Sequence, residues 1–239
     1  MHDFIDAFRF IAHNGAVPGQ HALPSLTRLA LETLRVGAIG VGISVVIAVP
    51  LGVWLGHIHR GSFLAINLGN IGRALPSLAV LAIGDAFLGL GLTVVELALV
   101  ILAVPPIITN AYLGVDSVDD DLVDAARGMG MSGREILMRV ELPLAIPLLF
   151  AGVRTAAVFV ISTTTIASLA GFSGSLGDVI ANETSYHFSG VLGAAICVAA
   201  LALAVEGVLA FLQRALTPKG LRAITDGPAN LAAPEAAMA

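Results

Sequence analysis

Five long apolar stretches, separated by short polar segments, dominate the hydrophobic pattern of the chain. A helix needs about 20 largely apolar residues to cross the hydrocarbon core of a bilayer. The pattern therefore predicts an all-α membrane protein with about five transmembrane helices, near residues 34–57, 62–87, 90–112, 144–170 and 189–212. A sixth span with a weaker apolar signature stays open.

The composition supports placement in a membrane. The 239 residues are 57% hydrophobic and 12% charged, whereas soluble globular domains carry about 25% charged residues. So small a charged fraction leaves too little polar surface to cover a water-soluble globule. The single cysteine, Cys197, lies in an apolar stretch and has no partner for a disulfide within the chain.

The pattern divides the chain into three parts. Residues 1–33 form an N-terminal segment whose apolar residues recur at helical spacing, as in a helix at a membrane surface. Residues 34–213 form the transmembrane domain. Residues 214–239 form a tail of small and polar residues, which we expect to be disordered at its end.

The longest polar interruption, residues 116–143, joins the third and fourth predicted spans. Asp116 or Ser117 can cap a first short helix, since both side chains accept hydrogen bonds from free backbone N–H groups. Gly128 and Gly130 permit a tight turn after that helix. We therefore expect a helix-turn-helix on one membrane face.

The second helix of this loop has its own start signal. Ser132 is followed three residues later by Glu135, the spacing of a capping box. Pro143 then marks the entry into the fourth span.

Arginine and lysine in the short flanks predict the orientation, because they are enriched on the cytoplasmic side. Five spans place the two termini on opposite faces, and most basic residues then share the face of the loop 116–143. We expect that loop and the C-terminus to be cytoplasmic and the N-terminus to be outside. The basic residues on the cytoplasmic face are Arg60, Arg127, Arg134, Arg139, Arg214, Lys219 and Arg222.

The loop also carries a spaced motif. It reads Asp-Ala-Ala, three residues, Gly, nine residues, Val, one residue and Leu-Pro. This spacing closely resembles the EAA motif, E-A-A-x3-G-x9-I-x-L-P, of permease subunits in bacterial ABC importers, with Asp in place of Glu and Val in place of Ile. The resemblance implies that the loop docks on the ATPase subunit through Asp124, Ala125, Ala126, Gly128, Gly130, Val140, Leu142 and Pro143.

Other segments resemble a narrower group. GRALPSLAVLA at 72–82 and SLAGFSGSLGDVI at 168–180 look like the permeases of importers for osmoprotectants, such as glycine betaine, choline, carnitine and proline-betaine. The likeness extends from about residue 33 to residue 212. It implies the type I ABC importer permease fold, with the loop as the cytoplasmic coupling element between the third and fourth spans.

The resemblance also implies partners. A second permease chain, identical or paralogous, would pair with this one in the bilayer of the bacterial cytoplasmic membrane. An ATPase dimer would bind ATP and Mg, and an extracytoplasmic substrate-binding protein would deliver the solute. The chain itself contains no GxxxxGK[ST] loop, so we expect it to be a non-catalytic subunit that binds no cofactor, metal or nucleic acid.

Several polar residues fall within the predicted spans. Ionisable groups at such depth are costly and usually face a cavity or a partner. For Glu96, a carboxylate at the membrane interface is an equally good interpretation. The hydroxyls of residues 162–165 could equally bond back to their own helix turn. For Arg154 we expect the side chain to snorkel to the cytoplasmic boundary. The candidates for the translocation pathway are Asn70, Arg73, Glu96, Ser162, Thr163, Thr164 and Thr165.

Three other functions can be weighed. A permease for methionine or other amino acids would share the same loop. An ion-coupled secondary transporter would normally show internal repeats with broken helices at matching places. A membrane-embedded enzyme would need convergent catalytic groups, and the chain has no HExxH or GxSxG motif.

Overall fold

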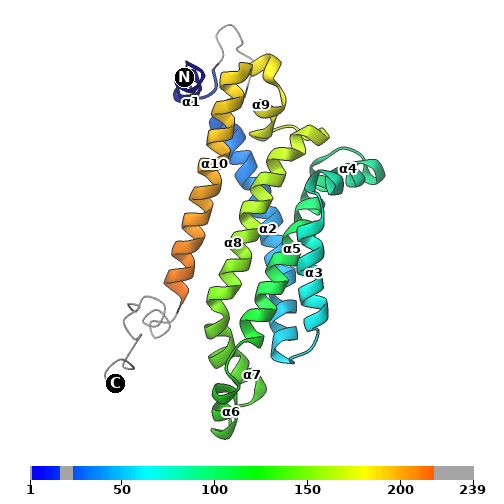
Figure 1. Cartoon of the computed structure of the whole chain (residues 1–239), viewed down its shortest axis with the longest axis vertical. Helices are drawn as coiled ribbons and strands as arrows, with labels where there is room; N and C mark the ends of the chain where they lie inside the picture. Colours follow the sequence, from blue (N-terminus) through cyan, green and yellow to red (C-terminus); the bar gives the residue numbers. More distant parts are fainter. Residues whose placement is uncertain (1, 17–23, 218–239) are drawn as a thin grey trace, which may run out of the picture.

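The computed structural model describes residues 2–16 and 24–217, and these form helices joined by short connections. Three long helices lie side by side along the molecule (Figure 1). They are α2 (Leu26–His57), α5 (Leu92–Asp116) and α8 (Leu142–Ile166). Together they form the centre of the bundle, and α5 is the most deeply packed of them.

Close backbone contact between α2 and α5 explains this packing. A Cβ atom at Gly52 would lie 2.6 Å from Cβ of Ala111, and one at Gly56 would lie 2.8 Å from Cβ of Val115. Such distances are below any ordinary carbon contact, so only glycine fits at these two places. Small residues at helix interfaces are typical of membrane proteins, where close van der Waals packing drives association.

Helix α2 begins earlier than the hydropathy predicted, at Leu26 in place of residue 34. The hydroxyl of Ser25 accepts a hydrogen bond from the backbone N–H of Arg28 and caps the first turn. The added turns carry polar residues, which lower the hydropathy without interrupting the helix. The helix therefore starts about two turns before the predicted span, while the boundary between an N-terminal segment 1–33 and the transmembrane domain stays a prediction.

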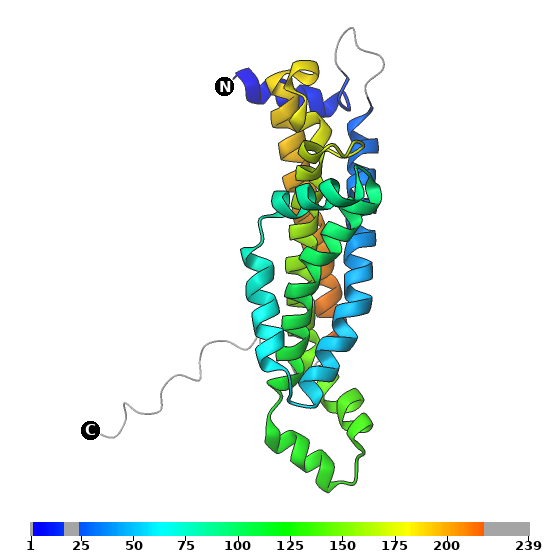
Figure 2. The same cartoon turned by 90° about the vertical axis from the view of Figure 1, so that its right-hand side faces the viewer.

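The second predicted span is broken. Residues 62–87 do not form one helix but two, α3 (Ser62–Ala74) and α4 (Ser77–Leu88), whose apolar parts meet at an angle of 89°. The cause is Pro76, which lacks an N–H donor and drives the residue before it, Leu75, into an extended conformation. Helix α4 therefore lies across the bundle while α3 runs along it (Figure 2).

The last part of the chain returns along the bundle. A 3₁₀ turn (Ala167–Ala170) ends α8, the short α9 (Gly177–Ala181) follows, and α10 (Glu183–Leu216) is kinked at His187, where φ is 58°. The N-terminal helix α1 (His2–Ala12) packs against the start of α10. Phe10 and Tyr186 meet there edge to face, with ring centroids 6.2 Å apart.

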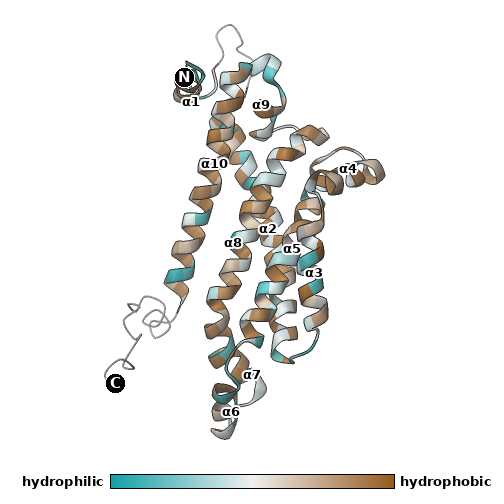
Figure 3. Cartoon of the chain, viewed as in Figure 1, coloured by the Kyte–Doolittle hydropathy of each residue, from teal (hydrophilic) through white to brown (hydrophobic). Residues whose placement is uncertain are grey.

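Hydrophobic residues dominate the long helices of the bundle along most of their length (Figure 3). Side chains such as Val46, Leu203 and Phe211 are at least 70% exposed, a pattern that suits a hydrocarbon surrounding and not water. In the described residues, four helices are long and apolar enough to cross a membrane, or five if the bent pair of α3 and α4 is counted as one span. This agrees with the expectation of about five spans.

The two ends of the bundle differ. Helices α1 and α9 lie at one end, and α6 (Asp120–Gly128) and α7 (Gly133–Ile136) lie at the other (Figure 1). The predicted disorder of the tail concerns residues beyond 217, which lie outside the described residues. The same holds for Lys219 and Arg222, two of the basic residues used to predict the orientation.

Candidate functional site

The loop between α5 and α8 forms the predicted helix-turn-helix, with a different first cap. Helix α5 continues through Asp116, so neither Asp116 nor Ser117 starts the next helix. Asp119 does so instead: its Oδ1 accepts a hydrogen bond from the backbone N–H of Asp121 at 2.9 Å. Two further acids in the first turn of α6 suit the positive end of the helix dipole.

Gly130 makes the turn that ends α6. Its φ is +84°, a left-handed conformation that favours glycine. Its N–H donates to the carbonyl of Arg127, and the N–H of Met131 donates to the carbonyl of Ala126. This pair of bonds is a Schellman motif, which satisfies carbonyls left free at the helix end. Gly128 lies inside α6 with helical geometry, so the turn depends on Gly130 alone.

The motif residues of α6 lie on two sides of the helix. Ala126 is 2% exposed and packs with Val123 and Ile136 inside the loop. Ala125 and Asp124 lie on the exposed side, where Asp124 forms an ion pair with Arg127 at 2.8 Å. A partner that meets this helix would therefore contact the exposed side, while Ala126 stabilises the loop from within.

The second helix of the loop starts at the predicted capping box. The carboxylate of Glu135 accepts hydrogen bonds from the backbone N–H and the hydroxyl of Ser132, both at 2.9 Å. These bonds favour the charged carboxylate and lower the pKa of Glu135. Farther on, Val140 packs with the inside of the loop, and Leu142 packs against the ends of the long helices. Pro143 lies in the first turn of α8, but the helical backbone runs into α8 from α7 and the π turn without a break, so the missing N–H of Pro143 leaves a gap in the ladder of helical hydrogen bonds.

A π-helical turn, Leu137–Glu141, joins α7 to α8, and it brings an unpredicted pair of residues together. The carboxylate of Glu141 is 2% exposed and lies 2.6 Å from Nδ1 of His57 at the end of α2. A second pair joins Nδ1 of His59 to Asp116 at 3.0 Å. The turn between α2 and α3 is thus bonded to both ends of the loop, beside a cavity of about 330 Å³.

This double connection was missed by sequence analysis, which gave no role to His57 or His59. Within the described residues, no group of three or more His, Cys, Asp or Glu side chains is placed to hold a metal ion. The signal that was available is Glu141 itself, an acid immediately before Leu142-Pro143 in an otherwise apolar run. Its partner could not be found because 84 residues separate the two.

The polar residues of the spans do not gather at one place. Glu96 lies on α5 in a pocket at the end opposite the loop. Asn70 is exposed on α3, and Arg73 lies on the same helix with a side chain outside the described part. The hydroxyls on α8 mostly bond back to their own helix: Ser162, Thr164 and Thr165 donate to carbonyls four residues earlier, and Thr163 is buried.

Arg154 has a partner within the bundle. Its Nε donates to Glu206 of α10 at 2.8 Å, and its Nη1 donates to the side-chain oxygen of Gln213 at 3.0 Å. The expectation that Arg154 snorkels to the cytoplasmic boundary is thus replaced by an ion pair between α8 and α10. The pair borders a groove of about 560 Å³, which Ser162 also lines.

Comparison with known proteins identifies the family to which this chain belongs. The model of the family described as "Binding-protein-dependent transport system inner membrane component" matches residues 21–218. The chain belongs to this family of transport-system membrane components. The matched range includes every long helix and the whole loop between α5 and α8.

Curated relatives in the family are similar over nearly their whole length. The glycine betaine/carnitine/choline transport system permease protein OpuCB of Bacillus subtilis is 39% identical over 82% of this chain and 90% of its own. The carnitine transport permease protein OpuCB of Listeria monocytogenes is 40% identical, over 81% and 88%. The osmoprotectant import permease protein OsmW of Salmonella typhimurium is 32% identical, over 82% and 94%.

Solved structures confirm the fold. The MetNI methionine ABC transporter, in inward-facing conformations, contains a chain with a TM-score of 0.69 and 22% identity, covering 81% of this chain and 96% of that one. An amino acid ABC transporter with histidines gives a TM-score of 0.63 and 20% identity, covering 88% and 97%. The type I ABC importer permease fold is thereby confirmed, and the protein is a multi-pass component of the inner membrane.

Proposed function

We propose that this chain is the permease subunit of an ATP-driven importer for osmoprotectants, solutes such as glycine betaine, carnitine and choline. The observation that carries the proposal is the 32–40% identity, over most of both chains, to permeases named for these solutes. In this role the chain forms part of the translocation path. It carries out no covalent chemistry, and a partner ATPase dimer holds ATP and Mg.

The loop between α5 and α8 is the proposed docking surface for the ATPase. Asp124, Ala125 and Gly128 present a shallow, exposed surface on α6, and no atom lies within 4 Å of where a Cβ of Gly128 would be. The internal packing of Ala126 and the bonds of His57 and Glu141 make the loop continuous with the long helices. A displacement of α6 by the ATPase can therefore be transmitted to α2 and α8, because no flexible connection lies between them.

The orientation follows from the same role. The end with α6 and α7 faces the cytoplasm and the ATPase, and the end with α1, α4 and α9 faces outward. A soluble binding protein delivers the solute to that outer end. A second permease chain, identical or paralogous, pairs with this one in the bilayer. The path then opens alternately to each side as ATP is bound and hydrolysed.

Transport by the complete importer in proteoliposomes tests this function. With the ATPase and the binding protein present, uptake of labelled glycine betaine, carnitine or choline should require internal ATP. Matched vesicles with an ATPase variant unable to hydrolyse ATP, or without the binding protein, should show background uptake. Excess unlabelled methionine and histidine should not compete; ATP-dependent uptake of either one in place of the osmoprotectants would assign the amino-acid class and refute the proposal.

A further inference from the structure

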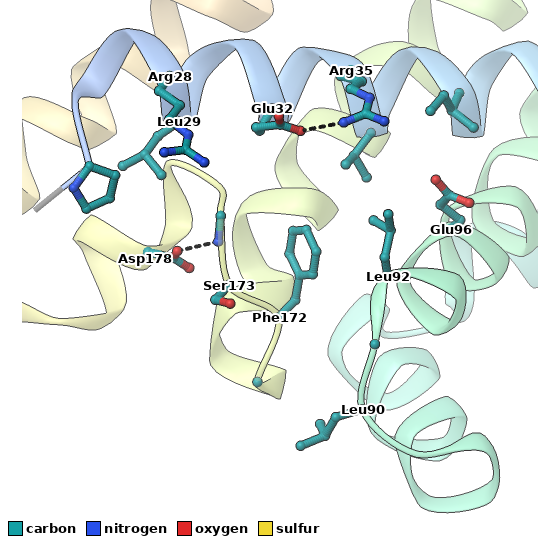
Figure 4. A pocket seen from close by; sticks show the side chains of 16 residues that line it. Arg28, Leu29, Glu32, Arg35, Leu90, Leu92, Glu96, Phe172, Ser173 and Asp178 are labelled. Atoms are coloured by element: carbon teal, nitrogen blue, oxygen red, sulfur yellow. Dashed lines mark hydrogen bonds and ion pairs between the residues drawn. The ribbon is translucent and has the colours of Figure 1, made fainter.

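A charged pocket lies at the end of the bundle opposite the α6 and α7 loop. Its volume is about 900 Å³, and it is bounded by the start of α2, the start of α5 and the segment between the 3₁₀ turn and α9 (Figure 4). Pockets of roughly 300–1,000 Å³ are the size that small-molecule ligands occupy. If the loop faces the cytoplasm, this pocket faces the side from which a solute arrives.

Five charged side chains line the pocket, and three of them are already engaged. Glu32 and Arg35 pair with each other at 3.3 Å. Asp178 accepts a hydrogen bond from the hydroxyl of Ser168 at 2.8 Å and another from the backbone N–H of Gly174. The charges of these three side chains are thus balanced or hydrogen-bonded by neighbouring groups of the protein.

The remaining two charges are a cation and an anion. In the part of the chain that the structure describes, neither the guanidinium of Arg28 nor the carboxylate of Glu96 has an ion-pair or side-chain hydrogen-bond partner. Arg28 comes from α2 and Glu96 from α5, so two different helices hold them. Glu96 is partly buried, so an unpaired carboxylate there is costly. Arg28 is exposed, so its guanidinium is free to bind a ligand that enters the pocket.

The two unpaired charges are separated within the pocket. Arg28 and Glu96 lie toward opposite ends of the pocket, with Phe172 and Leu92 between them (Figure 4). A guanidinium binds a carboxylate by charge-assisted hydrogen bonds. A quaternary ammonium group cannot donate hydrogen bonds, and it is bound through an anion and the face of an aromatic ring.

We propose that this pocket receives the zwitterionic form of a betaine-type solute at the outer end of the permease. The solute's carboxylate binds Arg28, and its quaternary ammonium lies against Glu96 and Phe172. This assignment rests on the proposed function and narrows it, because it separates carboxylated quaternary amines from choline, which has no carboxylate. Choline can use the Glu96 end of the pocket but gains nothing from Arg28.

The pocket is suited to brief occupancy. It is larger than a single small solute, it is open on one side, and a single aromatic residue, Phe172, lines it among the described residues. A solute there keeps part of its water, so binding is weak and release toward the path is fast. Tight binding is left to the separate binding protein.

Paired transport rates test the proposal. The complete importer, with binding protein saturated by either glycine betaine or choline, is reconstituted with Arg28→Gln, Glu96→Gln or the unchanged permease. Loss of one charge-assisted contact should cost roughly tenfold in rate. Arg28→Gln should slow glycine betaine uptake by about that factor and leave choline uptake unchanged, whereas Glu96→Gln should slow both. Arg28→Lys should restore most of the glycine betaine rate.

Two controls separate the possible failures. Arg9→Gln removes an arginine at the same end of the molecule that pairs with Asp6 and lies outside the pocket, so it should leave both rates unchanged. Binding-protein-stimulated ATP hydrolysis should persist in Arg28→Gln, which shows that docking and coupling are intact. Equal loss of both substrates in Arg28→Gln, or no loss, overturns the pocket assignment while the function stands. An unchanged permease that imports neither solute overturns the function, and the pocket assignment with it.

Discussion

The Nδ1 atom of His57 lies 2.6 Å from Oε2 of Glu141, and this contact bonds the end of α2 to the beginning of α8. Only 2% of Glu141 is exposed, so its carboxylate is shielded from water by the loop around it. The nearby pair of His59 and Asp116 is more open, with exposed fractions of 47% and 31%. Of the two contacts, the buried one should carry more of the mechanical connection between loop and bundle.

Removal of the buried contact should uncouple the loop. We expect His57→Ala to lower solute uptake at least tenfold, because it leaves the buried carboxylate of Glu141 unpaired, at a cost of about 1–3 kcal/mol, and the loop loses its hold on α2. His59→Ala removes the exposed pair and should change uptake less than about threefold, since exposed pairs contribute about 0–1 kcal/mol. Uptake and ATP hydrolysis measured on the same vesicles compare the two variants; equal losses would show that burial does not matter here.

The turn at Gly130 should be sensitive to backbone geometry and not to side-chain size. Gly130→Val should cost about 1–3 kcal/mol, because a β-branched residue resists a φ of +84°. Gly130→Asn should be tolerated better, since asparagine enters the left-handed region more readily. Gly207→Ala is the matched control, because Gly207 is helical within α10, lies outside the loop, and its added methyl group meets no atom within 4 Å.

Co-purification of the ATPase with each variant, together with uptake, gives the readout for this turn. The order of loss should be Gly130→Val, then Gly130→Asn, then Gly207→Ala with none. A variant series in which Asn and Val behave alike would instead point to direct contact between the ATPase and this position.

The ion pair of Arg154 and Glu206 should stabilise the contact between α8 and α10. Glu206→Gln leaves the guanidinium without its counter-ion inside the span, at a cost of roughly 2–3 kcal/mol. The double variant with Arg154→Gln removes both charges and should recover much of that loss. Thermal unfolding of the purified protein in detergent compares Glu206→Gln, Arg154→Gln and the double variant; additive losses in the double variant would mean that the two residues act independently.

The orientation can be checked with single cysteines in a Cys197→Ala background. Asp121 on α6 and Thr184 at the start of α10 are both exposed and lie at opposite ends of the bundle (Figure 1). Thr184→Cys should react with a membrane-impermeant thiol reagent in intact cells, and Asp121→Cys only after permeabilisation. The reverse pattern would invert the assignment of the cytoplasmic face.

Hydropathy and local signals predicted much of the fold. The apolar stretches located the long helices because each must bury its backbone polar groups in its own hydrogen bonds within the bilayer. The capping box at Ser132 was also confirmed, since it depends on two residues three positions apart. The break between α3 and α4 was not predicted: residues 62–87 are apolar on average despite polar residues such as Asn70 and Arg73, and the average hides the effect of Pro76.

The candidate site was less accessible from sequence. The spacing of the motif located the loop, but the separate sides taken by Ala125 and Ala126 depend on how α6 packs against Ile136. The partners of Glu141 and Arg154 lie 84 and 52 residues away along the chain. Contacts of that kind are set by the tertiary arrangement of helices, and no local pattern of apolar and polar residues encodes them.

The π-helical turn at Leu137–Glu141 determines how the protein responds to a change in the length of this segment. A π turn holds one residue more than an α turn, and one residue corresponds to about 100° of rotation around a helix axis. Deletion of a single residue there would yield a regular α-helix with α7 and α8 in nearly the same rotation about the axis, because a π turn absorbs its extra residue within the turn. The segment should therefore tolerate the loss of one residue better than the gain of one, since a further residue that the π turn cannot absorb would rotate the docking loop by about 100° around the axis of the membrane helix.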